Sequence, residues 1–138
     1  MKQLVVVGGI IEYNGKILCM QRNKGKYDYT SYKYEFPGGK LEEGETYPQA
    51  LMRELREEMD MKVFVEEKDY IAEVFHEYPD FSIHMKCYIC KPETDRFIRK
   101  EHINHVWLKP EELDSLDWAE ADKPIVKAVE DYYLGNNG

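Results

Sequence analysis

Residues 39–61 read GKLEEGETYPQALMRELREEMDM and contain the main predicted helix of the chain. Thr46 followed three residues later by Gln49 is typical of a helix N-terminus, where each side chain bonds to the backbone N–H of the other residue. The apolar residues of the helix that follows recur at every fourth position: Leu51, Leu55 and Met59. The stretch therefore predicts an amphipathic helix with its apolar side against a core.

The opposite side of this helix carries a cluster of glutamates. Glu54, Glu57 and Glu58 stand at i, i+3 and i+4, so their carboxylates share one face and repel each other by a few tenths of a kcal/mol per pair. No lysine lies on that face, so we expect a cation to neutralise it. Magnesium takes oxygen ligands, usually one or two carboxylates together with water and substrate phosphates. These three residues alone leave a solvated acidic face as the alternative.

The glutamates belong to a longer pattern of residues. In this chain the residues that define it are Gly39, Glu45, Arg53, Glu54, Leu55, Glu57, Glu58 and Met61. The pattern resembles the box of the Nudix hydrolase family, G-x5-E-x7-R-E-U-x-E-E-x-G-U, where U is apolar. Such a match arises by chance on the order of once in 10⁸ starting points. The segments 34–40, 101–107 and 121–124 resemble MutT-type members of that family, and most of all its CTP pyrophosphohydrolases.

The resemblance implies an enzyme that hydrolyses a nucleoside triphosphate to the monophosphate and pyrophosphate with Mg²⁺, for which Mn²⁺ can substitute. It implies that Glu57 and Glu58 bind the metal together with the backbone carbonyl of Gly38. Glu54 is a further ligand or orients the attacking water. The bound ion acts as a Lewis acid on phosphate oxygens and lowers the pKa of that water.

Other matched positions imply supporting roles. Arg53 pairs with Glu45 and holds the helix register, a task that suits the guanidinium fork. Glu101 matches a glutamate that supports metal binding or takes a proton from water, with a surface charge as the alternative. Arg22 and Lys40 are candidate phosphate contacts, or else solvated basic side chains.

Two residues are candidates for contact with the base. Phe36 stacks on the base or belongs to the core. Asp122 matches the residue that reads the base edge in MutT-type enzymes, although an aspartate before a helix is also a natural N-cap. An ionised Asp122 only accepts hydrogen bonds, which favours the exocyclic amine of cytosine over the O6 of guanine. In a buried site Asp122 would instead stay protonated and could also donate. Three tyrosines, Tyr27, Tyr29 and Tyr32, line the entrance or close the long loop that carries them.

Asp60 departs from the Nudix pattern, which has glycine at this position. The glycine ends the helix in a left-handed conformation, which aspartate tolerates at a cost of up to about 1 kcal/mol. We expect Asp60 to be a local stability cost without a part in the chemistry.

The remaining elements predict an α/β (α+β) fold in a single domain over residues 1–138, the Nudix fold, with a mixed sheet sandwiched between helices. We expect strands over 4–13, 16–22, 34–36, 61–65, 70–78, 81–91 and around 105–108, a turn at 37–39, and helices from Pro110 and Pro124. Asn14-Gly15 predicts a tight hairpin.

Composition excludes several classes of function. A net charge of −8 argues against a nucleic acid polymer as partner. The apolar run 4–11 is a buried strand rather than a signal peptide, and no segment is long enough to cross a membrane. Three cysteines, an odd number, suit a reducing compartment, so we expect a cytoplasmic monomer or homodimer. Cys87 and Cys90, three apart in a strand, point to opposite faces and serve core packing.

Three alternatives to the CTP or modified-nucleotide reading stay open. The first is an 8-oxo-dGTP pyrophosphatase. The second is a Nudix hydrolase of dinucleoside polyphosphates or nucleotide sugars, for which Tyr78-Pro79 is a weak marker. The third is a binding module without activity, which the retained glutamates of the box disfavour.

Overall fold

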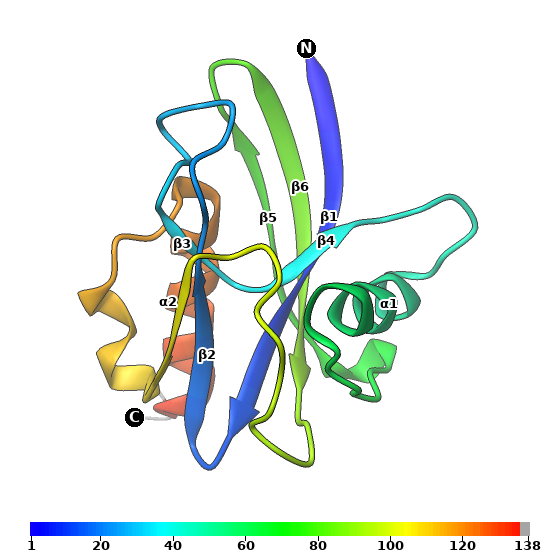
Figure 1. Cartoon of the computed structure of the whole chain (residues 1–138), viewed down its shortest axis with the longest axis vertical. Coiled ribbons are helices and arrows are strands. Elements are labelled where there is room, and N and C mark those ends of the chain that lie inside the picture. Colours follow the sequence, from blue (N-terminus) through cyan, green and yellow to red (C-terminus); the bar gives the residue numbers. More distant parts are fainter. Residues whose placement is uncertain (136–138) are drawn as a thin grey trace.

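The computed structural model describes residues 1–135; the last three residues of the predicted domain lie outside this range. Seven strands form a mixed sheet in the order β3–β2–β1–β6–β5, with β4 beside β1 and β7 beside β2 (Figure 1). The strands are β1 (Lys2–Tyr13), β2 (Lys16–Gln21), β3 (Tyr34–Glu35), β4 (Gly38–Lys40), β5 (Tyr70–Glu77), β6 (Phe81–Cys90) and β7 (Asn104–Leu108).

The long strand β1 organises the sheet. It begins the predicted hairpin with β2, and the turn residues Asn14 and Gly15 have φ of 52° and 79°, as a tight hairpin turn requires. Along its length β1 also pairs in parallel with β6, from Lys2 opposite Phe81 to Ile11 opposite Cys90. This parallel pair makes the sheet mixed, as the sequence predicts.

Helix α1 (Tyr47–Met59) covers one side of the sheet. Thr46 and Gln49 form the predicted reciprocal cap, and Leu51, Leu55 and Met59 are buried. These side chains join a core cluster that also contains Cys90. The predicted apolar side of the helix is therefore confirmed.

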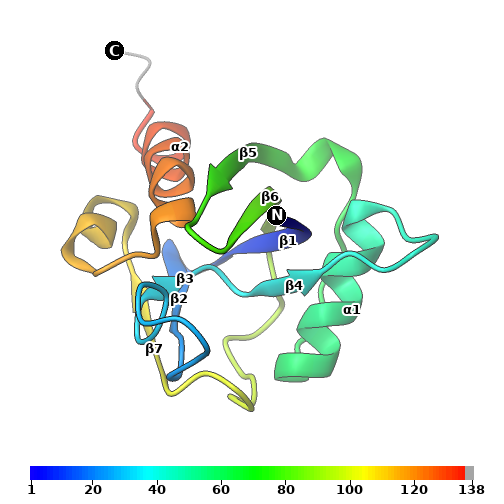
Figure 2. The same ribbon diagram turned by 90° about the horizontal axis from the view of Figure 1, so that it is seen from above.

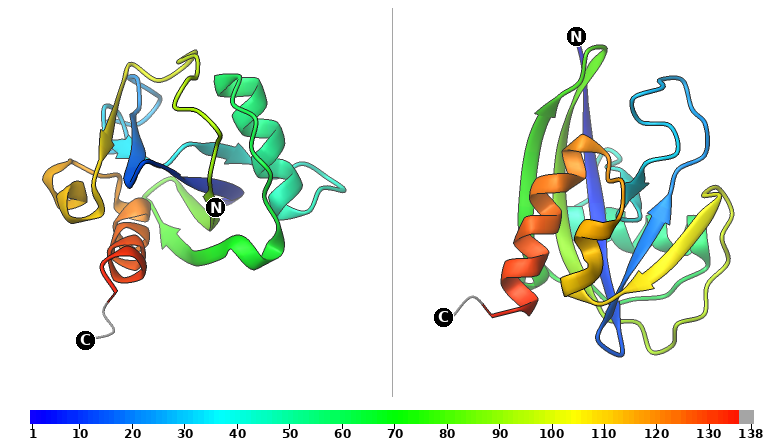
Figure 3. Two further views of the ribbon diagram at one scale, coloured as in Figure 1. Left: turned by 90° about the horizontal axis from the view of Figure 1, so that it is seen from below. Right: turned by 90° about the vertical axis from the view of Figure 1, so that its left-hand side faces the viewer.

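Helix α2 (Lys123–Tyr133) lies on the other side, as the view from above shows (Figure 2). Its buried residues Ile125, Val126 and Val129 share a second core cluster with Cys87. Cys87 and Cys90 thus face opposite cores, as their spacing predicts, and both are free thiols. Two short 3₁₀ helices, Pro110–Ser115 and Glu120–Asp122, precede α2 (Figure 3).

Two local predictions are wrong. Segment 61–65 is not a strand. Met61 and Val65 are buried against α1 while Phe64 is 76% exposed, so side-chain burial alternates as in a strand, but the segment does not pair with a neighbouring strand. Segment 37–39 is not a simple turn, because Gly38 and Gly39 begin β4 and pair with β1. A Cβ on Gly38 would overlap the backbone carbonyl of Val7, so glycine is needed for this close approach.

No helix within residues 1–135 has the length and apolar character that crossing a bilayer requires.

Candidate active site

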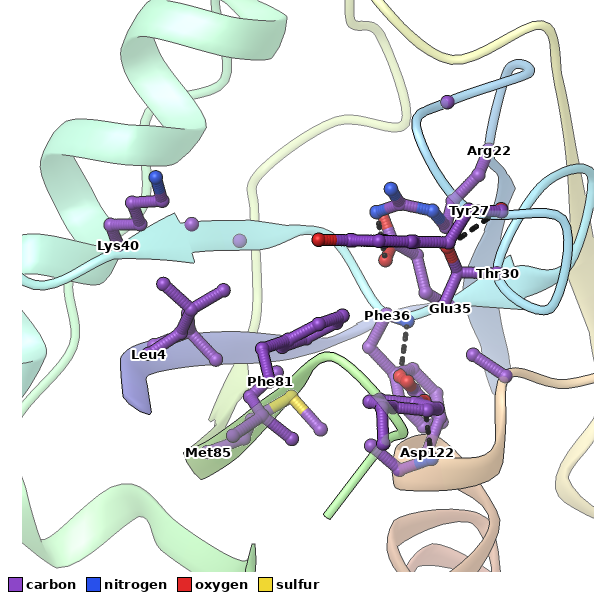
Figure 4. A pocket seen from close by; sticks show the side chains of 18 of the residues that line it. Leu4, Arg22, Tyr27, Thr30, Glu35, Phe36, Lys40, Phe81, Met85 and Asp122 are labelled. Atoms are coloured by element: carbon purple, nitrogen blue, oxygen red, sulfur yellow. Dashed lines mark hydrogen bonds and ion pairs between the residues drawn. The ribbon is translucent and has the colours of Figure 1, made fainter. Parts of the chain in front are cut away.

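A cavity of about 810 Å³ opens between α1, β4, β1, the loop after β2 and the 3₁₀ helix that precedes α2. Eight of the predicted site residues line it: Arg22, Phe36, Gly38, Lys40, Glu54, Glu58, Glu101 and Asp122. The close-up places Lys40 at one end and Arg22, Phe36 and Asp122 at the other (Figure 4). Apolar side chains from β1 and β6, among them Leu4 and Met85, lie between the two ends.

Arg53 is the main partner of the acidic residues around α1. Its Nε and Nη2 donate to the two carboxylate oxygens of Glu45 at 2.6 and 3.0 Å, which is the predicted forked pair. Its Nη1 reaches Glu54 at 2.9 Å and Glu57 at 3.1 Å, and its Nη2 also donates to the backbone carbonyl of Lys40. The guanidinium of Arg53 therefore supplies positive charge to the acidic face of α1. We did not expect this from the sequence, because no lysine lies on that face.

Arg53→Ala should lower the free energy of unfolding by about 2 kcal/mol, because it leaves largely buried carboxylates without their donor. The side chains of Arg53 and Glu54 are only 15% and 14% exposed. Urea unfolding followed by circular dichroism measures the change. Arg56→Ala, at an exposed position of the same helix, should stay within about 0.5 kcal/mol of the wild type. Equal stability of the two variants would contradict a structural role for the Arg53 fork.

Glu58 and Glu101 meet at the same end of the cavity, although they come from α1 and from the loop after β6. Burial raises the pKa of Glu58, and the neighbouring Glu101 carboxyl, within hydrogen-bond reach, raises it further. Burial also raises the pKa of Glu54, against the opposing effect of Arg53. Glu54, Glu58 and Glu101 therefore bring three acidic groups to one end of the cavity.

The chemistry of these donors fits a hard divalent cation, since all are oxygens. Within residues 1–135, no three histidine, cysteine, aspartate or glutamate side chains already form a compact ligand cluster, so the carboxyls must draw together around an ion. Strand β4 leaves room for this: a Cβ on Gly39 would overlap the Glu54 carboxylate. Glu57 is 57% exposed and lies outside the cavity lining, so its role as a ligand stays a prediction.

Asp122 lies at the other end of the cavity, and although it directly precedes α2, its side chain makes no capping hydrogen bond to that helix. Its Oδ2 accepts a hydrogen bond from the backbone N–H of Phe36 at 3.0 Å, and the residue is 5% exposed. Burial raises the pKa of Asp122 well above its usual range, and the negative charge of Glu35 adds to the rise. Phe36 is itself 3% exposed and packs on Trp118, so it belongs to the core while lining the cavity.

Glu35 and His102 also line the cavity, although the sequence gave neither of them a part in the chemistry. Glu35 accepts hydrogen bonds from Arg22 Nη1 at 3.2 Å and pairs with His102 Nε2 at 2.8 Å, and all three line the cavity. The segment 34–40 contains Glu35, but nothing in the sequence pairs it with residues 13 and 67 positions away. Arg22 is therefore held by Glu35 at the cavity wall, from which it can also reach a ligand.

The tyrosine loop closes over the turn between β5 and β6. Tyr29 donates to Asp80 at 2.8 Å and stacks on Tyr78. Tyr27 stacks on Phe81 (Figure 4). Tyr27 lines the cavity, and Tyr32 points into solvent with 50% exposure. The loop thus combines both predicted roles, lining the entrance through Tyr27 and closing the loop through Tyr29.

Comparison with known proteins identifies the family. A family model described as the NUDIX domain matches residues 2–129. The CTP pyrophosphohydrolase of Escherichia coli (strain K12) is 38% identical over 128 residues, which cover 93% of this chain and 92% of that protein. The 8-oxo-dGTP diphosphatase of the same organism is 29% identical over 126 residues, covering 91% and 95% of the two chains.

The fold agrees with this relationship. The solution structure of the E. coli ORF135 protein superposes with a TM-score of 0.77 at 34% identity, over 99% of this chain and 94% of the other. The family model spans nearly the whole chain, and Gly39, Glu54 and Glu58 of the box line one cavity. The chain therefore belongs to the Nudix hydrolase family and is an enzyme of that family.

Proposed function

We propose that this Nudix hydrolase splits a nucleoside triphosphate, preferably CTP or dCTP, into the monophosphate and pyrophosphate in a magnesium-dependent reaction. The observation that carries the proposal is the cavity with two chemically different ends. One end holds Glu54, Glu58 and Glu101, and the other holds Asp122 beside apolar side chains. A volume of about 810 Å³ suits a nucleotide that lies along it, with phosphates at the acidic end.

At the phosphate end, Glu54, Glu58 and Glu101, with Glu57 and the carbonyl of Gly38, would hold Mg²⁺. The bound ion supplies Lewis-acid activation of the phosphate and of the attacking water. The chain positions these groups: Arg53 fixes Glu54 against Lys40 of β4, and Lys40 lies where it can contact a phosphate. A carboxylate with a raised pKa is also a suitable acceptor for the proton of the attacking water.

At the base end, the structure changes the argument about Asp122. Burial of Asp122 favours the neutral acid over the ionised carboxylate, and the neutral acid both donates and accepts hydrogen bonds. A neutral Asp122 can pair with N3 and the amine of cytosine, and equally with O6 and N1–H of guanine. The preference for a cytosine nucleotide therefore rests on the 38% identity to a CTP pyrophosphohydrolase, against 29% to an 8-oxo-dGTP diphosphatase.

The direct test measures release of monophosphate and pyrophosphate with Mg²⁺ from a panel of normal, oxidised and methylated nucleotides. ADP-ribose and diadenosine polyphosphates belong in the panel, because Tyr78, the weak marker for such substrates, also lines the cavity. We expect kcat/KM for CTP or dCTP to exceed that for 8-oxo-dGTP. A higher value for 8-oxo-dGTP would favour the second candidate, which the diphosphatase relative supports.

Asp122→Leu should lower kcat/KM for the preferred nucleotide about tenfold or more, because the base then meets no partner in a buried site. Asp122→Asn should keep most of the activity, since the amide donates and accepts as the neutral acid does and can still bond to Phe36 N. If Asp122 were ionised, Asp122→Asn should instead narrow or invert the ratio of kcat/KM for dCTP to that for 8-oxo-dGTP. Wild-type kcat/KM values in both variants, measured on folded protein, would remove Asp122 from base recognition.

The cellular setting is a further part of the proposal. Cys19, Cys87 and Cys90 are free and buried. Free thiols suit a reducing compartment, and we place the reaction in the cytoplasm.

A further inference from the structure

The glycine of the Nudix pattern is replaced here by Asp60, and the structure gives this residue a partner. Asp60 ends α1 with φ 51° and ψ 33°, the left-handed conformation that glycine adopts at lower cost. Its Oδ1 accepts a hydrogen bond from Lys100 Nζ at 3.1 Å. Lys100 Nζ also donates to the backbone carbonyl of Glu57 at 3.0 Å. One lysine therefore satisfies a carbonyl in the last turn of α1 and the side chain that follows the helix.

The contact joins two segments that are far apart in the sequence. Lys100 belongs to the loop between β6 and β7, which passes alongside α1 as the yellow-green segment of Figure 1. The backbone N–H of Ile98 donates to the carbonyl of Met59 at 2.9 Å, so the loop is bound to the end of α1 at two points. The end of α1 and the loop therefore form one attached unit.

The next residue of the loop is Glu101, which faces Glu58 in the cavity. On its other side, His102 is held by Glu35 at 2.8 Å. Glu101 thus lies between two loop residues that are fixed by side-chain contacts. Lys100 bonds to the end of α1, and His102 pairs with Glu35 of β3. If the Lys100 anchor is lost, the loop keeps its contact at Ile98 but is no longer fixed directly beside the glutamate.

We propose that the Asp60–Lys100 ion pair positions Glu101 against Glu58, so that Asp60 and Lys100 are positioning residues of the acidic end of the cavity. The inference deepens the proposed function and rests on it for its effect on turnover. It also replaces the expectation that Asp60 is only a local stability cost. In a chain with glycine at this position, Lys100 would keep the carbonyl of Glu57 as its sole partner at the helix end.

Asp60→Gly and Lys100→Met test the proposal with Mn²⁺ titrated alone and followed by electron paramagnetic resonance. Each variant should raise the Kd for Mn²⁺ and lower kcat about fivefold, the factor that corresponds to about 1 kcal/mol. Asp60→Gly should do so without lowering the free energy of unfolding, because glycine relieves the left-handed conformation. If the Asp60–Lys100 ion pair had only a structural role, any loss of Mn²⁺ affinity and kcat would come with a lower free energy of unfolding.

Two controls sharpen the test. Lys100→Arg keeps a donor at the helix end and should stay near the wild type. Lys127→Met breaks a similar exposed ion pair, with Asp131 at 2.9 Å on α2, and should leave Mn²⁺ affinity and kcat unchanged. Wild-type affinity in both Asp60→Gly and Lys100→Met, or an equal loss in Lys127→Met, would overturn the inference.

The two proposals fail in different ways. A wild-type chain that binds Mn²⁺ but releases no pyrophosphate from any nucleotide contradicts the proposed function, and the Mn²⁺ titrations of the variants still decide the inference. A wild-type chain that binds no Mn²⁺ overturns the inference itself.

Discussion

Excess EDTA should lower the release of nucleoside monophosphate by at least ~1000-fold, and added Mg²⁺ or Mn²⁺ should restore it. A Lewis acid at a phosphoryl centre stabilises the transition state by several kcal/mol, which corresponds to a factor of this size. Arg53, the cation built into the acidic face, cannot replace it, because its donors are already taken by Glu45, Glu54, Glu57 and the carbonyl of Lys40. Product formation is followed by chromatography, which needs no metal-dependent coupling enzyme.

The control for this experiment is the fold of the chelated protein. Circular dichroism and the urea midpoint should be nearly the same with and without EDTA, because the core clusters on both sides of the sheet consist of apolar side chains. Undiminished turnover in EDTA would contradict a role for a dissociable metal. Unfolding by EDTA would instead show that an ion holds the fold together.

Glu58→Gln should lower kcat at least ~100-fold while the protein stays folded. The amide keeps the shape of the side chain but removes the anion, and an interaction made only in the transition state acts mainly on kcat. We expect a similar loss for Glu57→Gln, since its carboxylate is 57% exposed, pairs with Arg53 at 3.1 Å and can turn toward an ion. Steady-state kinetics on the best nucleotide of the panel provides the measurement.

Glu43→Gln is the matched control for these variants. Glu43 is an exposed glutamate in the loop just before α1, and it is absent from the cavity lining. Its kcat should equal that of the wild type. Full activity in both Glu57→Gln and Glu58→Gln would support the alternative that the acidic side of α1 is only a solvated face.

The sequence predicts those parts of the fold that local rules determine. The β1–β2 hairpin follows from Asn14-Gly15, and α1 follows from its cap and its apolar spacing. Segment 61–65 misled because burial alternates there as in a strand, although no neighbouring strand lies beside it. Alternation reports which side chains are buried, whereas a strand also needs a partner for its backbone, and that partner is a long-range property.

The same distinction applies to the site. The Arg53–Glu45 pair was predictable, because its residues lie within one motif and are eight positions apart. The contact of Asp122 with Phe36 and that of Lys100 with Asp60 join residues 86 and 40 positions apart. Each of these two contacts depends on how the loops run over the folded sheet. The protonation state favoured for Asp122 follows from that burial, which the residue type alone does not determine.

The parallel pairing of β1 with β6 has a consequence for synthesis on the ribosome. β1 ends at Tyr13, but its partner is complete only at Cys90. At 5–20 residues per second, the apolar run of β1 waits roughly 4 to 15 seconds for that partner. During this interval the nascent chain offers β2 and later β4 as neighbours, and one side of β1 stays unpaired. Chaperones that bind extended apolar segments therefore have their main opportunity before β6 emerges.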